Sequence, residues 1–317
     1  MKRRHLAALA AAALAAPGIF AQERTLKLVV GFAPGGSSDQ LTRLVADKLR
    51  ALLGQNVIVE NKPGAAGRIS LGEIKRAAPD GQTLVMAASG GLVVAPWLYT
   101  NLPYDALTDF TPVARVASFD FAVTAGPAAP PGGIREVLAG IKVNPDKGSY
   151  GTSGAGTLGH FTGVMLSQTA GVNMVHVPYK GGAPAAQDLM AGTIPLMVDT
   201  ASETLEQHKA GRVRILAVSG ERRSRILPEV PTLKESGINM TADGYFGLYG
   251  PAGIPAATVQ RIDAAVAEVL KMQDVQDKIY ALGLVPSYLG PVALRALQLD
   301  QYKRWEQPVK ASGFKPD

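Results

Sequence analysis

The sequence predicts an α/β protein with two αβ lobes and a ligand cleft between them. Strand-like and helix-like segments alternate from residue 25 to 124, and a second alternating series runs from 134 to 219. Strands that alternate with helices of this length imply a mostly parallel sheet covered on both faces. A break rich in Gly and Pro at 126–133 separates the two series.

In the first series, short apolar runs predict strands and amphipathic runs predict helices. The expected elements are strand 26–31, helix 40–53, strand 56–60, helix 66–78, strand 83–87, a Pro-interrupted stretch at 91–107 and a long β-prone run at 113–124.

The second series also alternates predicted strands and helices. The expected elements are helix 134–143, strand 149–151, helix 157–169, strand 174–178, helix 183–191, strand 194–199, helix 202–210 and strand 213–219. An irregular, β-leaning segment follows at 236–249, and the chain finishes with helices at 256–272, 274–282 and 291–312.

The simplest topology interrupts one lobe with the other. We expect residues 23–124 and 245–317 to form lobe one and residues 125–244 to form lobe two, with the terminal helices packed back on lobe one. Ligands of such folds bind outside the carboxyl ends of the strands. The Gly-rich turns of both lobes should therefore face one cleft.

The first Gly-rich turn follows the apolar run Leu28–Val30 and leads into the helix at 40–53. Gly35 and Gly36 permit backbone conformations that other residues avoid. Ser38, like its neighbours, can cap the helix. Because a helix N-terminus carries unpaired N–H groups and partial positive charge, this turn predicts a seat for an anion.

The second Gly-rich turn spans 149–157 and predicts a second anion seat. Its stretch 154–159 matches the dinucleotide fingerprint G-x-G-x-x-G, between a strand and a helix. The complete fingerprint needs an acidic residue about 20 positions on, and 173–180 offers none. The turn therefore favours a carboxylate ligand over a cofactor.

The same turn leaves an enzyme alternative open. The run 151–155 nearly matches the nucleophile elbow G-x-S-x-G, with Ser153 as nucleophile and His160 and Asp199 as triad partners. In hydrolases with this elbow the histidine follows the acid in the chain, whereas His160 precedes Asp199. A helix-face histidine bonded to a backbone carbonyl is the favoured interpretation of His160.

Two charged residues lie near the second turn. Lys180 is either a solvated turn lysine or a cleft residue, and the sequence does not separate these interpretations. Asp199 ends a strand on the cleft side of the expected sheet, where it can cap the following helix or accept a hydrogen bond from a ligand amine or hydroxyl.

The N-terminus predicts export. Residues 1–21 have a basic start, an Ala/Leu-rich run at 6–16 and a small residue, Ala21, at the expected cleavage site, as a signal peptide does. The apolar run is shorter than the roughly 20 residues that span a bilayer. Because the chain has no Cys, thiolate metal sites and cysteine nucleophiles are excluded. The net charge of +6 includes the basic start, so it does not indicate a nucleic-acid partner.

Several short motifs together resemble the Bug family, the periplasmic substrate-binding receptors of tripartite tricarboxylate transporters. The motifs are Phe32–Gly36 with Asp39, Glu60–Gly67, Pro79–Gly81, Asp109–Val113, Gly151–Gly156 with His160, and Val177–Gly181 through Asp188 and Gly192 to Asp199. Each motif is weak alone, but their order and spacing are specific. Arg68 and Thr200 depart from the family's usual residues at their positions.

The resemblance implies a type II periplasmic binding protein fold that closes on a small carboxylate without catalysis, cofactor or metal. It also implies membrane transporter subunits as partners, a monomer and a periplasmic location. The loops 32–39, 87–92 and 151–158 contain no Lys or Arg, so N–H groups and hydroxyls must hold the carboxylate. The expected ligand-binding residues are Phe32, Ala33, Gly35, Gly36, Ser38, Ser89, Gly90, Thr152, Ser153, Gly154, Thr157 and Asp199. The ligand's identity, among amino acids, dicarboxylates, aromatic acids and nicotinate-like molecules, stays open.

Overall fold

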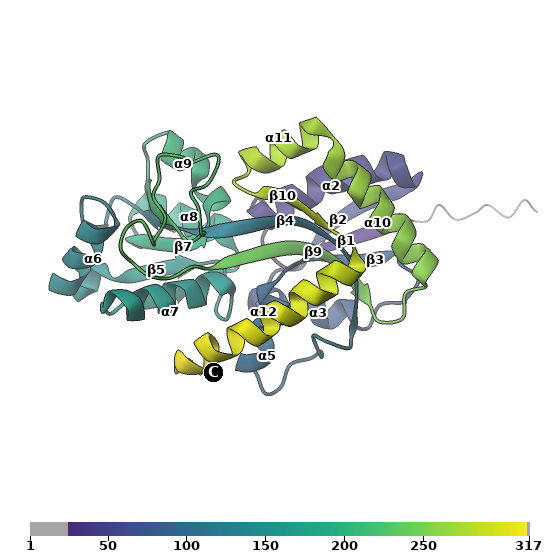
Figure 1. Ribbon diagram of the computed structural model, residues 1–317, viewed down its shortest axis with the longest axis horizontal. Helices are drawn as coiled ribbons and strands as arrows, with labels where there is room; N and C mark the ends of the chain where they lie inside the picture. The colour runs from purple at the N-terminus through teal and green to yellow at the C-terminus, as the bar shows by residue number, and fades with distance from the viewer. Residues whose placement is uncertain (1–24, 316–317) are drawn as a thin grey trace, which may run out of the picture.

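The computed structural model describes residues 25–315, so the expected signal peptide at 1–21 lies outside the described residues. Ten strands form one sheet, and helices cover its faces (Figure 1). The sheet has two regions. The first region contains β1, β2, β3, β9, β10 and the early part of β4, and the second contains β5 to β8 and the late part of β4.

In the first region, β1 (Thr25–Val30) pairs in parallel with β2 (Asn56–Asn61) on one side and with β3 (Thr83–Ala88) on the other. β9 (Asp243–Pro251) then pairs antiparallel with β3. Apolar side chains on both faces of β1 and β3 are buried, as expected for a sheet covered on both sides, whereas the edge strand β2 leaves Ile58 exposed.

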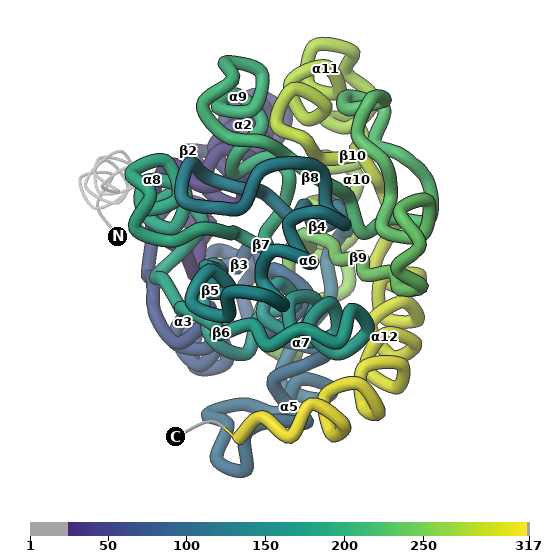
Figure 2. The backbone as a smooth tube through the Cα atoms, turned by 90° about the vertical axis from the view of Figure 1, so that its left-hand side faces the viewer, coloured from purple at the N-terminus to yellow at the C-terminus, as the bar shows by residue number. Residues whose placement is uncertain are grey.

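In the second region, β5 (Ser149–Thr152) pairs in parallel with β6 (Val175–Pro178) and β7 (Leu196–Thr200). β7 and β8 (Arg214–Val218) both pair antiparallel with the end of β4. Figure 2 is viewed from this side and shows the second region in front, with α12 running beside α7.

β4 (Phe110–Ala125) joins the two regions. Up to Asp120 it pairs with β9, and near its middle it also pairs with β10 (Val285–Leu289). From Phe121 onward it pairs with β7 and β8 instead. The chain thus changes region within one continuous strand, and it returns between β8 and β9. The lobe limits at 124/125 and 244/245 stay predictions.

Most helices lie where the sequence expected them, with some differences in length. Their bounds are α2 (Ser37–Leu53), α3 (Arg68–Ile74), α4 (Gly90–Val93), α5 (Ala95–Leu98), α6 (Ile134–Val143), α7 (Leu158–Ala170), α8 (Gly182–Ala191), α9 (Leu205–Lys209), α10 (Ala256–Lys271), α11 (Gln273–Ala281) and α12 (Pro291–Ala311). Of these, α4 and α5 form largely in the stretch at 91–107, for which no helix was predicted. Short 3₁₀ turns are η1 (Ala65–Gly67), η2 (Pro145–Lys147) and η3 (Ala201–Glu203). As predicted, α10, α11 and α12 pack on the first region, α10 and α11 against α2 and α12 against α4 and α5.

Three expectations about elements were wrong. The helix expected at 66–78 begins at Arg68, because Ala65 and Ala66 have positive φ angles of 48° and 53° that no right-handed helix contains. The helix expected at 202–210 is split between η3 and α9. Strand β10 was missed, because Pro286 inside a short run argues against a strand.

β9 is more regular than the sequence indicated. Its glycines lower the apparent strand propensity of 236–249, yet 243–251 forms a continuous strand. A Cβ on Gly244 would lie 2.5 Å from the Phe119 ring, and one on Gly250 would lie 2.3 Å from the Ile254 side chain. These glycines allow neighbouring side chains to pack directly on the strand's backbone.

Each region has its own hydrophobic core. The larger core surrounds β1, β3 and β9 and includes Leu28, Leu84 and Tyr249. A separate core in the second region includes Val137, Leu196 and Leu216. Among residues 25–315, no helix combines the length and apolarity needed to cross a bilayer.

Candidate functional site

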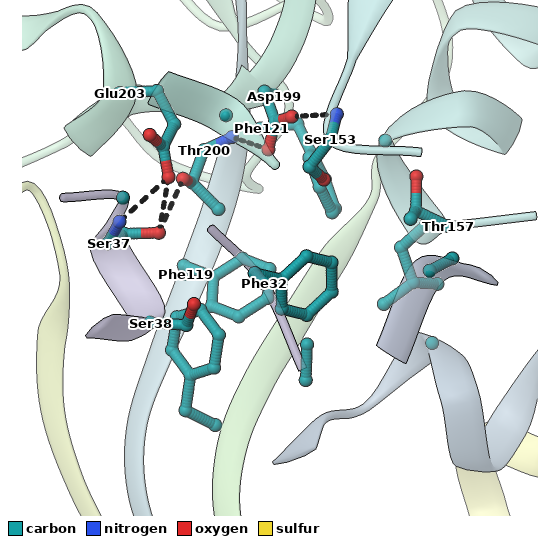
Figure 3. Close-up of a pocket in the computed structure, with 18 of the residues that line it drawn as sticks. Phe32, Ser37, Ser38, Phe119, Phe121, Ser153, Thr157, Asp199, Thr200 and Glu203 are labelled. Atoms are coloured by element: carbon teal, nitrogen blue, oxygen red, sulfur yellow. Dashed lines mark hydrogen bonds between the residues drawn. The ribbon is translucent and has the colours of Figure 1, made fainter. Parts of the chain in front are cut away.

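A pocket lies between the two sheet regions (Figure 3). Its empty volume is about 540 Å³, part of which opens to solvent. The lining residues come from the first turns of α2, α4, α7 and α8 and the loops before them, from β3, β4, β7 and β9, and from η1 and η3. They are Phe32, Gly36, Ser37, Ser38, Ala66, Ala88, Gly90, Gly91, Phe119, Phe121, Ser153, Thr157, Leu158, Gly159, Gly182, Asp199, Thr200, Glu203 and Phe246.

The N-terminus of α2 is held by a carboxylate of the protein itself. Glu203, on η3, accepts hydrogen bonds at Oε1 from the Ser37 N–H at 2.9 Å and from the Ser37 hydroxyl at 2.7 Å. The Ser37 hydroxyl also lies 3.3 Å from Thr200 Oγ1. Glu203 therefore occupies part of the anion seat that the sequence assigned to a ligand, and it links the two sheet regions.

Ser38 is the next residue of α2, and its situation differs. Its side chain is only 4 % exposed and lines the pocket. Within residues 25–315, its hydroxyl has no hydrogen-bond partner, and the N–H groups of Ser38 and Asp39 have no acceptor. The hydroxyl is therefore free to bond to a molecule that enters the pocket.

Asp39 faces away from the pocket and stabilises the first turn. Its carboxylate accepts hydrogen bonds from the Gly35 N–H at 2.9 Å, from Arg43 at 3.0 Å and from Asn61 at 2.9 Å. Burial raises the pKa of Asp39, but these hydrogen bonds outweigh burial and lower the pKa below its usual value.

The turn before α7 satisfies most of its own N–H groups. The Gly154 N–H donates to Thr152 Oγ1 at 3.2 Å, and the Gly156 N–H donates to His160 Nδ1 at 3.2 Å. Thr157 caps the helix by accepting from the His160 N–H at 3.2 Å. In residues 25–315, the N–H groups of Leu158 and Gly159 have no acceptor, and both residues line the pocket. The free donors of this helix are thus its first two amides.

His160 is a positioning residue for this turn. It is 2 % exposed and stacks on His176 with ring centroids 3.9 Å apart. Burial lowers the pKa of His160 to about 4, so the ring is neutral and Nδ1 can accept a hydrogen bond. The expected bond from this ring to a backbone carbonyl was wrong, since Nδ1 accepts the Gly156 N–H.

Of the residues at 25–315 that line the pocket, two carry carboxyl groups and none is Lys, Arg or His. Asp199 is 6 % exposed and accepts from the Ser153 N–H at 2.6 Å and from its neighbour's N–H, that of Thr200, at 2.8 Å. Burial raises the pKa of Asp199 to about 6. Burial and the nearby Asp199 charge raise the pKa of Glu203 to about 7.

The structure brings seven of the twelve expected ligand residues to the pocket wall: Phe32, Gly36, Ser38, Gly90, Ser153, Thr157 and Asp199. The other five lie around the pocket and support it. Their roles in ligand binding stay predictions.

Four of these supporting residues make defined contacts. Ser89 is fully buried and accepts from the Tyr245 N–H at 3.2 Å. Thr152 is fully buried and lies 2.7 Å from His176 Nε2. The Ala33 N–H donates to the Lys180 carbonyl at 3.2 Å, and a Cβ on Gly154 would lie 3.3 Å from Ala66 Cβ. Gly35, the fifth, donates its N–H to Asp39, as described above.

Sequence reasoning missed Glu203 and the phenylalanines of the sheet. Phe119 and Phe121 stand two positions apart in β4 and both reach the pocket, with Phe246 of β9 beside Phe119 at a centroid distance of 4.6 Å. The two-residue spacing was a usable signal, because side chains at i and i+2 share one face of a strand. No comparable sequence pattern marked Glu203 as a pocket residue.

A second cavity adjoins the pocket and shares Phe32, Ala66 and Ser153 with it. Arg68 and Lys180 line this second cavity. The Arg68 guanidinium lies 3.6 Å from the centre of the Tyr99 ring, and its Nη1 is buried without a hydrogen-bond partner in the described residues.

The geometry does not support the serine hydrolase alternative. The Ser153 N–H is bonded to Asp199, and within residues 25–315 neither ring nitrogen of His160 is hydrogen-bonded to Ser153. The His160 ring is instead stacked on His176 and accepts an amide. Nucleophilic catalysis requires a base within hydrogen-bond reach of the nucleophile.

Comparisons with known proteins agree on one family. Residues 41–314 match the family model described as the tripartite tricarboxylate transporter family receptor. The periplasmic binding protein BugD is 34 % identical, with a TM-score of 0.88 over 93 % of this chain and 99 % of that chain.

Two other solved structures contain ligands. MatC from Rhodopseudomonas palustris, solved with bound malate, is 29 % identical with a TM-score of 0.85 over 91 % of this chain and 99 % of that chain. The R. palustris protein Rpa4515, solved with adipate, is 29 % identical with a TM-score of 0.90 over 93 % and 99 % of the respective chains.

Proposed function

Because this chain belongs to the tripartite tricarboxylate transporter receptor family, whose members are periplasmic solute-binding proteins, we propose that it binds a small carboxylate between its two sheet regions and presents it to a membrane transporter. The neighbours solved with malate and adipate support a carboxylate as the ligand. The protein acts by binding and carries out no reaction of its own.

One observation carries the proposal. The first two amides of α7 and the hydroxyl of Ser38, from opposite sides of the pocket, have no partner among the described residues. α2 and α7 have 17 and 13 residues, so each N-terminus carries a substantial partial positive charge. Hydrogen bonds from such donors to a carboxylate are charge-assisted and suit an anion without a basic side chain.

Binding should favour a closed arrangement of two lobes. We take lobe one as 23–124 and 245–317 and lobe two as 125–244, joined by the crossings in β4 and before β9. Ligand groups that contact both α2 and α7 interact with both lobes only in the closed state. Such a ligand shifts the open–closed equilibrium toward closure, and the closed monomer is the form that transporter subunits would recognise.

A thermal-shift screen over small carboxylates tests the function. A ligand that binds only the folded state raises the melting temperature, by an amount that grows with concentration relative to Kd. We expect at least one mono- or dicarboxylate to raise the midpoint of wild type, and the Ser38→Ala variant to show a smaller shift at the same concentration. If no carboxylate in the screen stabilises wild type, the proposed function is wrong.

A further inference from the structure

We propose that the ligand carries a protonated amine in addition to its carboxylate, and that Asp199 and Glu203 bind this amine. The inference rests on the proposed function, since it assumes that the pocket between the sheet regions holds a carboxylate ligand. It goes further in assigning opposite ends of the pocket to opposite charges.

The charged side chains that line the pocket are acidic. Asp199 and Glu203 both line it, whereas no Lys, Arg or His lines it in the part of the chain that the structure describes. The basic side chains nearby, Arg68 and Lys180, line the adjoining cavity instead. A plain dicarboxylate would add negative charge beside two acids, and like charges at close range disfavour one another. A protonated amine would compensate them.

The unused hydrogen-bond acceptor sites of Asp199 and Glu203 also favour an amine. Asp199 receives one backbone N–H at each of its oxygens, and both bonds from Ser37 reach a single oxygen of Glu203. An ionised carboxylate has about four acceptor sites. Glu203 Oε2 lies beside Gly182, where a Cβ would come within 2.4 Å of it, and Gly182 is itself a lining residue. The pair therefore keeps acceptor sites for the donors of an ammonium group.

An independent feature indicates that the ligand also has a negative end. The Leu158 and Gly159 amides have no acceptor in the described residues, and the Ser38 hydroxyl faces the pocket without a partner among them. Figure 3 shows Ser38 below Phe119, away from Asp199 and Glu203. The rings of Phe32, Phe119, Phe121 and Phe246 line the space between. Their apolar surfaces suit a hydrocarbon body, and their faces also attract cations. A short chain with an amine at one end and a carboxylate at the other matches this order.

The raised pKa values of the two acids give the proposal a second readout. The elements around the pair contribute Ser, Thr, Ala, Leu and Phe side chains and glycine backbone to the pocket, so within the described residues each acid is the other's charged neighbour there. An ammonium group beside them lowers both pKa values, and binding near pH 7 should release protons. A dicarboxylate in the same position should raise them and take protons up.

Matched ligand pairs test the proposal by calorimetry. Aspartate and malate differ by an amine in place of a hydroxyl, and 5-aminopentanoate and adipate differ by an amine in place of one carboxylate. We expect the amine of each pair to bind wild type at least about tenfold more tightly, with proton release measured in two buffers of different ionisation enthalpy. Where neither member of a pair binds, the strongest carboxylate from the thermal screen is compared with its amine-bearing analogue.

The variant Glu203→Gln keeps the shape of the side chain and removes its charge. It should reduce the preference for the amine by about tenfold and reduce the proton release, while Asp199→Asn serves as a second variant if the first is unstable. Glu206→Gln, the same change at an exposed residue outside the pocket, should change neither quantity.

Two results would overturn the proposal in different ways. If malate and adipate, or another carboxylate without an amine, bind as tightly as the amine-bearing partner, the carboxylate function stands and the charge assignment is wrong. If no carboxylate of either kind binds, the function proposed above fails and this inference fails with it.

Discussion

The N-termini of α2 and α7 look alike in sequence and differ in the structure. Each follows a strand and a Gly-rich turn, and each has hydroxyl residues at its start, Ser37 and Ser38 in α2 and the cap Thr157 in α7. At α2, Glu203 from the other sheet region takes the first N–H and the hydroxyl of Ser37. At α7, the cap is the helix's own Thr157, and the amides of Leu158 and Gly159 have no acceptor in the described residues.

The difference shows that a helix N-terminus determines the charge it attracts but not which anion satisfies it. A distant carboxylate of the same chain competes with the ligand for the α2 seat. The first two amides of α7 remain for the ligand, whereas at α2 Glu203 takes the first amide and leaves those of Ser38 and Asp39. Four changes would break or sharpen this contrast, from the largest expected effect to the smallest.

Acid should weaken the α7 turn more than the α2 end. The pKa of His160 falls from 6.5 unfolded to about 4 folded, so its contribution is complete above pH 6.5 and is lost as pH falls to about 4. At 1.36 kcal/mol per pH unit this amounts to about 3 kcal/mol. Asp199 and Glu203, whose pKa values are raised, act in the opposite direction over an overlapping range.

The difference between wild type and His160→Gln measures this effect together with its influence on the stacked His176, whose pKa is lowered by burial and by the His160 charge. The free energy of unfolding, measured by urea titration from pH 7 to 4, should fall less steeply in the variant than in wild type. Parallel curves would mean that His160 is not buried in its neutral form.

Gly90→Ala should reduce ligand affinity by about 1.5–3 kcal/mol, the range for losing a hydrogen bond to a charged group. A Cβ at this position would lie 3.2 Å from the Leu158 nitrogen, where it would obstruct a carboxylate. Calorimetry with the best ligand of the screen measures the change. Ala88→Gly, which removes a methyl group from the same wall, is the control, and an equal loss in both variants would count against the α7 seat.

Ser38→Ala should weaken every carboxylate ligand by about 0.5–1.5 kcal/mol, with little change in the free energy of unfolding, because the hydroxyl has no partner in the described residues. Its neighbour supplies the contrast. Ser37→Ala removes a donor to Glu203 and should raise the pKa of Glu203 further. A loss of binding in Ser37→Ala without a loss in Ser38→Ala would reverse the assignment of the two residues.

Lys180→Ala should change affinity by less than about 0.5 kcal/mol, because the side chain is exposed and lines the adjoining cavity. Calorimetry against the same ligand measures this. A loss comparable with that of Gly90→Ala would show that a basic side chain, rather than helix amides, holds the carboxylate.

Much of the fold could be predicted from local patterns. The bounds of α6 match the prediction at both ends, and those of α2 and α12 match at one end or within one residue. Elements whose conformation depends on tertiary contacts were harder to predict. The glycines of β9 are explained by the side chains of Phe119 and Ile254, which pack directly on its backbone. The turn at Ala65–Ala66 has a backbone conformation that alanine rarely adopts.

In the site, too, residues marked by local patterns were predicted and residues placed by long-range contacts were not. The turns around Ser38 and Ser153 were visible because Gly and hydroxyl residues between a strand and a helix have a local meaning. Glu203 was not visible, because its partner Ser37 is 166 positions away and nothing near Glu203 in the sequence marks it as facing a cleft. The sequence alone could not show that a distant side chain, Glu203, binds the N-terminus of α2.

The most direct test of the account is a crystal structure with the best carboxylate of the thermal screen bound. We expect the ligand carboxylate within hydrogen-bond distance of the Leu158 and Gly159 amides and the Ser38 hydroxyl, with Glu203 still bonded to Ser37. A structure in which Glu203 has turned away and the ligand carboxylate occupies the Ser37 N–H would contradict it.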